Sequence, residues 1–168
     1  MELSKQHRRF LLIDQGAVPT AFNFVINGFI AWALFRSAAA VPLWGESSVG
    51  VDLLITAFLL PFLTCVIVSA LVARQVRSGK VPPLPSGQLP LSRWFQRSAL
   101  MRGLLLGAAG VLFCGVPVVW ALSLGQAQPI AVTSFVAFKA VWAAMLAFMV
   151  TPVVGWWALA SASSAQPA

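Results

Sequence analysis

Charged residues are scarce in this sequence: they make up 9% of its 168 residues, whereas hydrophobic residues make up 60%. A soluble domain of this size could not hide so large an apolar fraction from water. The scarcity of charge therefore excludes a water-soluble globular domain, and it predicts a protein whose solvent is lipid.

Other scarcities restrict the chemistry. His7 is the only histidine and precedes the first apolar stretch, which excludes haem or metal ligation by histidines within the membrane. The four acidic residues all lie away from the middle of the long apolar stretches, which argues against carboxylate-driven proton coupling. No glycine-rich phosphate loop and no nucleophile beside a base occurs. We therefore expect no catalysis, no cofactor and no metal.

Long apolar runs are what the sequence does contain. A helix rises about 1.5 Å per residue, so a hydrocarbon core about 30 Å thick needs roughly 20 apolar residues. Segments 17–35, 53–73 and 104–124 reach this length, as does one within 129–159. The first is too long for the apolar part of a secretory signal. The sequence thus predicts an all-α integral membrane four-helix bundle.

The basic residues predict the direction of these spans. One side receives Lys5, Arg8 and Arg9 before the first span and Arg74, Arg77, Lys80, Arg93, Arg97 and Arg102 between the second and third. Arg36 is the only basic residue in the loops on the opposite side. An excess of Lys and Arg marks the cytoplasmic face, so both termini are expected there, in a cell membrane that we take to be a bacterial inner membrane. Topology and anionic headgroups explain the net charge of +7 without nucleic acid.

This topology divides the chain into five parts. They are a cytoplasmic amphipathic tail (1–16), a first hairpin (17–74), a basic loop with a short interfacial helix at 92–97 (75–102), a second hairpin (103–160) and a cytoplasmic tail (161–168). A shift of 87 or 88 positions aligns Trp32 and its two successors with Trp120 and its two successors, and it places Asp52 opposite Lys139. The match favours two repeated hairpins related by an axis along the membrane normal, although apolar helices also resemble one another by composition.

Lys139 is the only ionisable residue well inside a predicted span, and such residues are candidates for function. It lies roughly 25 Å along the helix from Trp156, which we expect at the cytoplasmic interface. Lys139 is thus expected near the outer boundary of the hydrocarbon. We predict an ion pair between Lys139 and Asp52, with Glu46 as the other available carboxylate. A substrate or ion site is the alternative.

A polar stripe follows the first span, where Thr20, Asn23 and Asn27 recur at helical spacing. Such side chains must meet protein or water rather than lipid. They are expected either to form hydrogen bonds between helices or, with Thr64 of the second span, to line a polar path.

Small residues follow one face of the third span, namely Gly103, Gly107, Gly110 and Cys114. Small residues allow another backbone to approach closely, so this face predicts tight helix packing. The partner helix is expected either in the same chain or in a second copy.

These features favour a non-enzymatic subunit or assembly partner of a membrane complex, held by the glycine face and the polar stripe, in a homo-oligomer or with a larger partner. The alternative is a small homo-oligomeric channel or transporter for an ion or small solute. An enzyme acting on lipid or quinone would require titratable groups that converge on a pocket.

Overall fold

Four long helices dominate the computed structural model, which describes residues 5–84, 98–125 and 129–165. Those long and apolar enough to cross a membrane are Gln6–Phe35, Val49–Arg77, Ala99–Leu124 and Val132–Ser164. They confirm the all-α class and the four predicted spans, as expected of a multi-pass membrane protein. The first three begin before the predicted spans because each helix continues past the charged residue that bounds its apolar run, namely Asp14, Asp52 or Arg102. The predicted interfacial helix at 92–97 lies outside the described residues.

Two of these helices contain a wide π-helical turn. The first helix consists of α1 (Lys5–Arg9), η1 (Phe10–Ala17) and α2 (Val18–Phe35). The third consists of α4 (Ala99–Gly110), η3 (Val111–Gly115) and α5 (Val116–Leu124). Each π segment ends two residues before a proline, Pro19 or Pro117. Proline lacks the N–H of an α-helical bond and its ring crowds the preceding turn, which the wider turn relieves.

The second helix, α3 (Val49–Arg77), has a defined cap at each end. The hydroxyl of Ser48 accepts a hydrogen bond from the Val51 backbone N–H, as an N-cap serine does. After the last turn, Gly79 adopts a φ of 72°. Glycine takes this left-handed conformation without steric cost, so the chain can turn out of the helix there.

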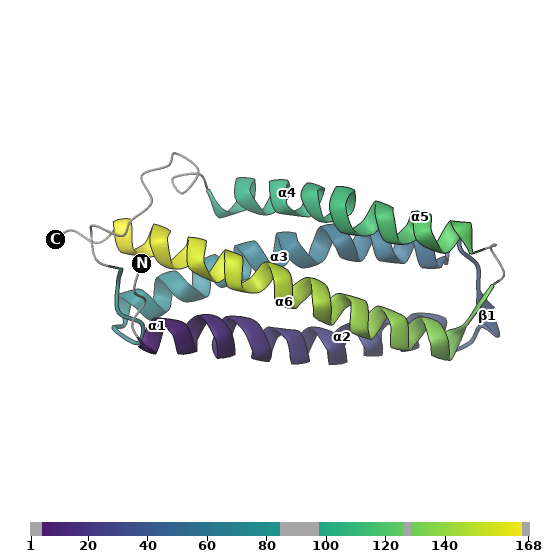
Figure 1. Cartoon of the computed structure of the whole chain (residues 1–168), viewed down its shortest axis with the longest axis horizontal. Coiled ribbons are helices and arrows are strands. Elements are labelled where there is room, and N and C mark those ends of the chain that lie inside the picture. The colour runs from purple at the N-terminus through teal and green to yellow at the C-terminus, as the bar shows by residue number, and fades with distance from the viewer. Residues whose placement is uncertain (1–4, 85–97, 126–128, 166–168) are drawn as a thin grey trace.

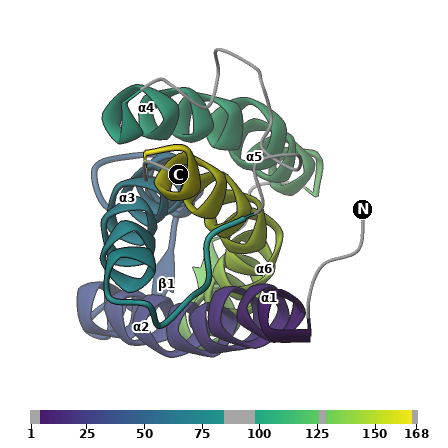
Figure 2. The same cartoon turned by 90° about the vertical axis from the view of Figure 1, so that its left-hand side faces the viewer.

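The helices lie lengthwise beside one another (Figure 1). The fourth helix, α6 (Val132–Ser164), packs against both α2 and α3, and α4 packs on α3. Seen end-on, α2 and α4 lie on opposite sides, with α3 and α6 between them (Figure 2). The consecutive helices α2 and α3 are not among the closely packed pairs. The bundle is therefore a chain of contacts from α2 through α6 and α3 to α4.

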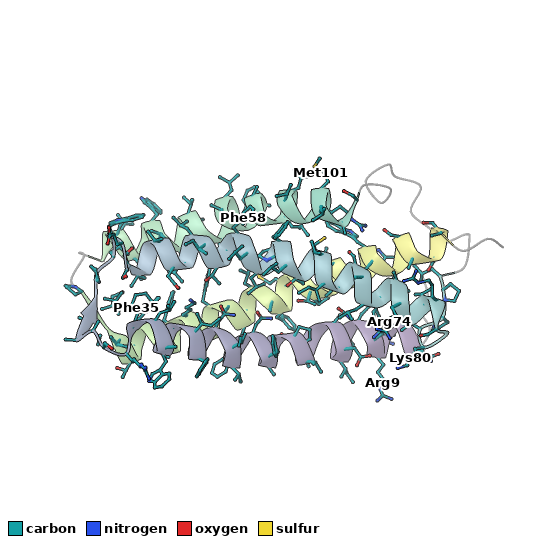
Figure 3. The ribbon with its side chains drawn as sticks, turned by 180° about the vertical axis from the view of Figure 1, so that it is seen from behind. Arg9, Phe35, Phe58, Arg74, Lys80 and Met101 are labelled. Atoms are coloured by element: carbon teal, nitrogen blue, oxygen red, sulfur yellow. The ribbon has the colours of Figure 1, made fainter. Side chains whose placement is uncertain are left out.

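The two ends of the bundle differ in how they are closed. At one end, β1 (Ala40–Val41) pairs antiparallel with β2 (Ile130–Ala131), with Val41 opposite Ile130. We call this the strand end. The start of α1 and the end of α6 lie together at the other end (Figure 1). Arg9, Arg74 and Lys80 are found there, with Phe35 at the far end (Figure 3), and we call it the basic end.

A hydrophobic cluster lies near each end. At the strand end, the rings of Phe35 and Phe135 meet edge to face with their centroids 5.2 Å apart, and both are buried. At the basic end, Phe10, Leu84 and Leu159 belong to a second buried cluster. The packing of apolar side chains therefore holds the helices together near both ends of the bundle.

Candidate functional site

Lys139 and Asp52 form a buried ion pair between α6 and α3. Lys139 Nζ lies 2.6 Å from Asp52 Oδ1, and the two side chains are only 2% and 12% exposed. This is the pairing predicted from the sequence. Glu46, the other candidate, is exposed in the loop before α3. The pair joins two helices that run in the same direction, close to the strand end.

The position of each partner helps to explain the pairing. Asp52 stands in the first turn of α3, where a negative charge also interacts favourably with the positive end of the helix dipole. Lys139 lies inside α6, where its ammonium group would be costly without a counter-charge. Asp52 Oδ2 is buried and has no hydrogen-bond partner among the described residues. The pair therefore neutralises the charge of the lysine but leaves one acceptor atom unused.

The polar stripe of α2 bonds mainly to its own helix. Thr20 Oγ1 donates to the Gly16 carbonyl oxygen at 2.8 Å, and Asn23 Nδ2 donates to Pro19 O at 2.9 Å. Asn27 Nδ2 donates to Asn23 O at 3.1 Å. The expected bonds between helices are thus not formed by these three side chains in the described structure. A helix can satisfy its own short polar side chains through the carbonyl four residues earlier, which the spacing alone does not reveal.

Thr64 does not join this stripe. It lies half-buried on α3, which is not closely packed against α2. No hydrogen bond links it to the stripe within the described part of the chain. The four polar residues grouped by the sequence therefore belong to two separate surfaces.

The glycine face of α4 packs tightly, and its partner is α3 of the same chain. A Cβ at Gly103 would lie 3.1 Å from the carbonyl oxygen of Phe62, and one at Gly107 would lie 2.9 Å from that of Phe58. A Cβ at Gly110 would overlap the carbonyl oxygen of Ala57. Cys114 is half-buried on η3, the next segment of the third helix, and packs beside a small apolar cluster. Of the two possibilities left open by the sequence, the contact within the chain is the one observed.

The contact with α3 corrects the prediction that the glycine face binds a partner subunit. The glycine face cannot hold another subunit while α3 covers it, because the backbones already approach too closely to admit a Cβ. Any association with another chain must use other surfaces.

Several buried polar side chains were missed by sequence reasoning. Gln15 is 8% exposed and lies over Gly155, where a Cβ would come within 2.7 Å of Gln15 Cγ. Gln15 Oε1 and Thr151 Oγ1 are buried without hydrogen-bond partners in the described structure. Gln15 precedes the apolar run that defined the first span, so hydropathy gave no reason to place it inside. The available indication of a tightly packed, buried face on α6 was the spacing of Thr151 and Gly155, which lie one turn apart.

Polar contacts also hold the basic end together. His7 Nε2 lies 2.9 Å from the Pro82 carbonyl oxygen, and the Leu84 backbone N–H donates to Ser163 Oγ at 2.8 Å. Arg102 Nη1 donates to Ser161 Oγ at 2.7 Å. These bonds attach the segment after α3 to α1 and to the end of α6, and they attach the start of α4 to the end of α6.

A shallow apolar groove of about 280 Å³ lies between α2 and α6 on the outer surface. Thr20 and Phe24 line it from α2, and Val141, Met145, Phe148 and Met149 line it from α6. Among the described residues, no group of three or more His, Cys, Asp or Glu side chains is placed to hold a metal ion. The arrangement consists of an ion pair, polar groups bonded to their own helix and apolar outer surfaces.

No family model, curated protein or solved structure matches this chain. Its function must therefore be inferred from its own residues.

Proposed function

We propose that the chain spans a cell membrane with its basic end in the cytoplasm, where both termini would then lie. Arg8, Arg9, Arg77 and Lys80 are exposed at the basic end, whereas Arg36 is the exposed cation near the strand end of the described structure. Figure 3 shows Arg9, Arg74 and Lys80 gathered at one end of the molecule. The positive-inside rule assigns such an end to the cytoplasm, and a bacterial inner membrane is the proposed location.

We also propose that the chain contains two repeated hairpins, 17–74 and 103–160, related by an axis along the bundle. The helix contacts support this proposal: α2 of the first hairpin packs on α6 of the second, and α4 of the second packs on α3 of the first. Asp52 and Lys139 occupy matching positions in the two hairpins and contact each other. Equivalent residues meet in this way beside a two-fold axis.

As a function, we propose a non-enzymatic subunit or assembly partner of a membrane complex, which binds transmembrane helices of other chains through α2. One observation carries this proposal: α2 is a peripheral helix that packs on α6, and large side chains cover its outward face. Phe22, Phe29 and Trp32 are 64%, 58% and 46% exposed. Aromatic side chains are preferred anchors in interfaces because they contribute a large contact area at little cost in entropy.

The test is gentle extraction from the native membrane, followed by measurement of the particle mass and identification of the co-purifying proteins. A photo-crosslinking residue at Phe22 should attach to a partner chain, whereas the same residue at Phe113, which is 73% exposed on η3, should not. A particle that contains only copies of this chain would contradict the subunit proposal, and equal crosslinking at the two positions would contradict the role of α2.

A small homo-oligomeric channel or transporter is the second candidate. Asp52 Oδ2, Gln15 Oε1 and Thr151 Oγ1 favour it, because buried polar atoms without protein partners are places where water can bind. The path would be lined by Asn23, Asn27, Thr64 and Lys139, and it would have to form between copies of the chain because Thr64 lies on a different surface from the two asparagines. The discriminating variant replaces both Asn23 and Asn27 with Leu. Lost solute flux in proteoliposomes with unchanged assembly would favour the path, whereas weakened assembly would favour helix association.

A further inference from the structure

Arg102 is a buried cation at the basic end, and one of its N–H groups has no hydrogen-bond partner among the described residues. It lies in the first turn of α4, after the N-cap residue Ser98, and its residue exposure is 5%. Its Nη1 donates to Ser161 Oγ, and its Nε is buried with no partner among the described residues. A guanidinium carries five N–H donors and stays charged at any physiological pH. Among the described residues, this permanent positive charge has a serine hydroxyl as its hydrogen-bond partner and no carboxylate paired with it.

The acidic residues of the described structure cannot neutralise Arg102. The sequence contains four: Asp14 is exposed on η1, Glu46 is exposed near the strand end, and Asp52 binds Lys139. The fourth, Glu2, lies outside the described residues. The described part of the chain contains a single ion pair, that of Lys139. Burying a charge without a partner costs several kcal/mol, so a counter-charge from outside the chain would stabilise the fold.

The depth of Arg102 indicates the kind of counter-charge. Ser161 follows Trp157 by about one helical turn, or roughly 6 Å along α6. Tryptophans near a span end sit at the level of the interface, so the contact between Arg102 and Ser161 lies among the lipid headgroups. Phosphate groups are concentrated at that level, and the guanidinium plane matches their oxygens in a bidentate arrangement.

The electrostatic field around Arg102 also favours an anion. Arg102 stands near the N-terminus of α4, where the helix dipole is positive and disfavours a cation but favours an anion. Arg74, Arg77 and Lys80 add positive charge at the same end of the bundle. An anion bound here would relieve the repulsion that the chain leaves uncompensated.

We propose that Arg102 binds a phosphate group at the basic end, with Ser161 holding the guanidinium in place. Two sources have this chemistry, the headgroup of an anionic phospholipid and free inorganic phosphate. The inference is independent of the subunit proposal, because it concerns a different end and a different partner.

The test uses the full-length protein, delipidated in a neutral detergent, and measures its thermal unfolding by tryptophan fluorescence and its bound lipids by native mass spectrometry. The additives are phosphatidylglycerol, a diacylglycerol with the same acyl chains, and inorganic phosphate. We expect phosphatidylglycerol to raise the unfolding temperature and to remain bound, while the diacylglycerol does neither. If inorganic phosphate alone reproduces the rise, the ligand is the free anion; if phosphatidylglycerol alone does so, it is the lipid.

The variants make the site specific. Arg102→Gln should weaken the apparent affinity for the phosphate ligand about tenfold or more. Arg77→Gln is the matched control, since Arg77 is exposed at the same end and should behave as the wild type. If Arg102→Gln does not fold, Arg102→Lys keeps the charge but not the bidentate geometry, and should lower the affinity while preserving the helices.

Two results would overturn the proposal. One is an equal stabilisation of wild type and Arg102 variants by every phosphate source. The other is a Glu2→Gln variant that loses as much stability as Arg102→Gln, with no further loss in the double variant, because Glu2 would then be the counter-charge.

Discussion

Lys139 and Arg102 are both buried cations, but the chain treats them differently. Lys139 near the strand end has a carboxylate at 2.6 Å, whereas Arg102 at the basic end has a serine hydroxyl at 2.7 Å. The charge of Lys139 is neutralised by a carboxylate of its own chain, whereas Arg102 has no carboxylate beside it among the described residues. The buried cation near the strand end is therefore neutralised within the chain, whereas the one at the basic end is suited to an external anion. The predictions below test this difference.

The largest effect is expected when Lys139 loses its partner. Asp52→Leu leaves a buried ammonium group without a counter-charge, and it should lower the free energy of unfolding by about 3–5 kcal/mol. Unfolding in mixed detergent micelles, followed by circular dichroism, measures this change. A loss below about 1 kcal/mol would show that Lys139 finds another partner, and the contrast between the two ends would then fail.

The double variant Asp52→Leu with Lys139→Met is the control. Because an apolar pair of similar volume often replaces a buried ion pair at little cost, it should recover most of the lost stability. A double variant as unstable as the single one would mean that packing around α3, rather than charge, is what was damaged.

The next largest effect is expected where α3 packs against the glycine face of α4. This contact could hold the helices together without the ion pair. Gly110→Ala places a Cβ against the carbonyl oxygen of Ala57, so the helices must separate, at a cost of about 1–3 kcal/mol. The same unfolding assay measures it. Ala108→Leu on the exposed face of α4 is the control and should change little. If both variants are neutral, the glycine face does not hold α4 to α3.

Much of this arrangement could be predicted from sequence, for physical reasons that particular residues make clear. Hydropathy located the four spans because lipid imposes their length. The pairing of Asp52 with Lys139 was predictable because a lysine in a span needs a carboxylate and few are present. The sequence predicted that the glycine face packs tightly against another helix. It did not predict that this helix is α3, because small residues allow any neighbouring backbone to approach closely.

The basic end was harder to predict. Arg102 belongs to a group of basic residues that the positive-inside rule explains without reference to burial, so nothing distinguished it from exposed Arg77. Gln15 lies in a π-helical segment that a hydropathy profile assigns to the tail. The polar stripe on α2 was correctly placed on one helix face, but hydrogen bonds to the preceding turn are equally consistent with that spacing. The periodicity of the sequence does not show whether a polar side chain bonds to its own helix or to another one.

A smaller effect on stability is expected when the N-cap serine of a helix is removed, and its size should differ between the two ends. Ser48 caps α3 near the strand end and is 1% exposed, whereas Ser98 caps α4 at the basic end and is exposed. Ser48→Ala should cost about 1 kcal/mol of unfolding free energy, because the Val51 N–H loses its acceptor away from water. Ser98→Ala should cost less, since water replaces the hydroxyl. Equal losses would indicate that the basic end excludes water as completely as the strand end.

The smallest effect is expected at Thr151, and it separates the two functional proposals. Its hydroxyl is buried in α6, and its residue exposure is 1%; no hydrogen-bond partner is present among the described residues. If the interior is dry, Thr151→Val removes an unsatisfied polar atom at constant shape, and unfolding free energy should stay the same or rise by up to about 1 kcal/mol. Thr20→Val is the matched control, since it deletes a formed bond to Gly16 and should cost about 0.5–1.5 kcal/mol. A loss of stability at Thr151 would instead mean that water binds its hydroxyl inside the bundle, which would support the channel proposal over the subunit one.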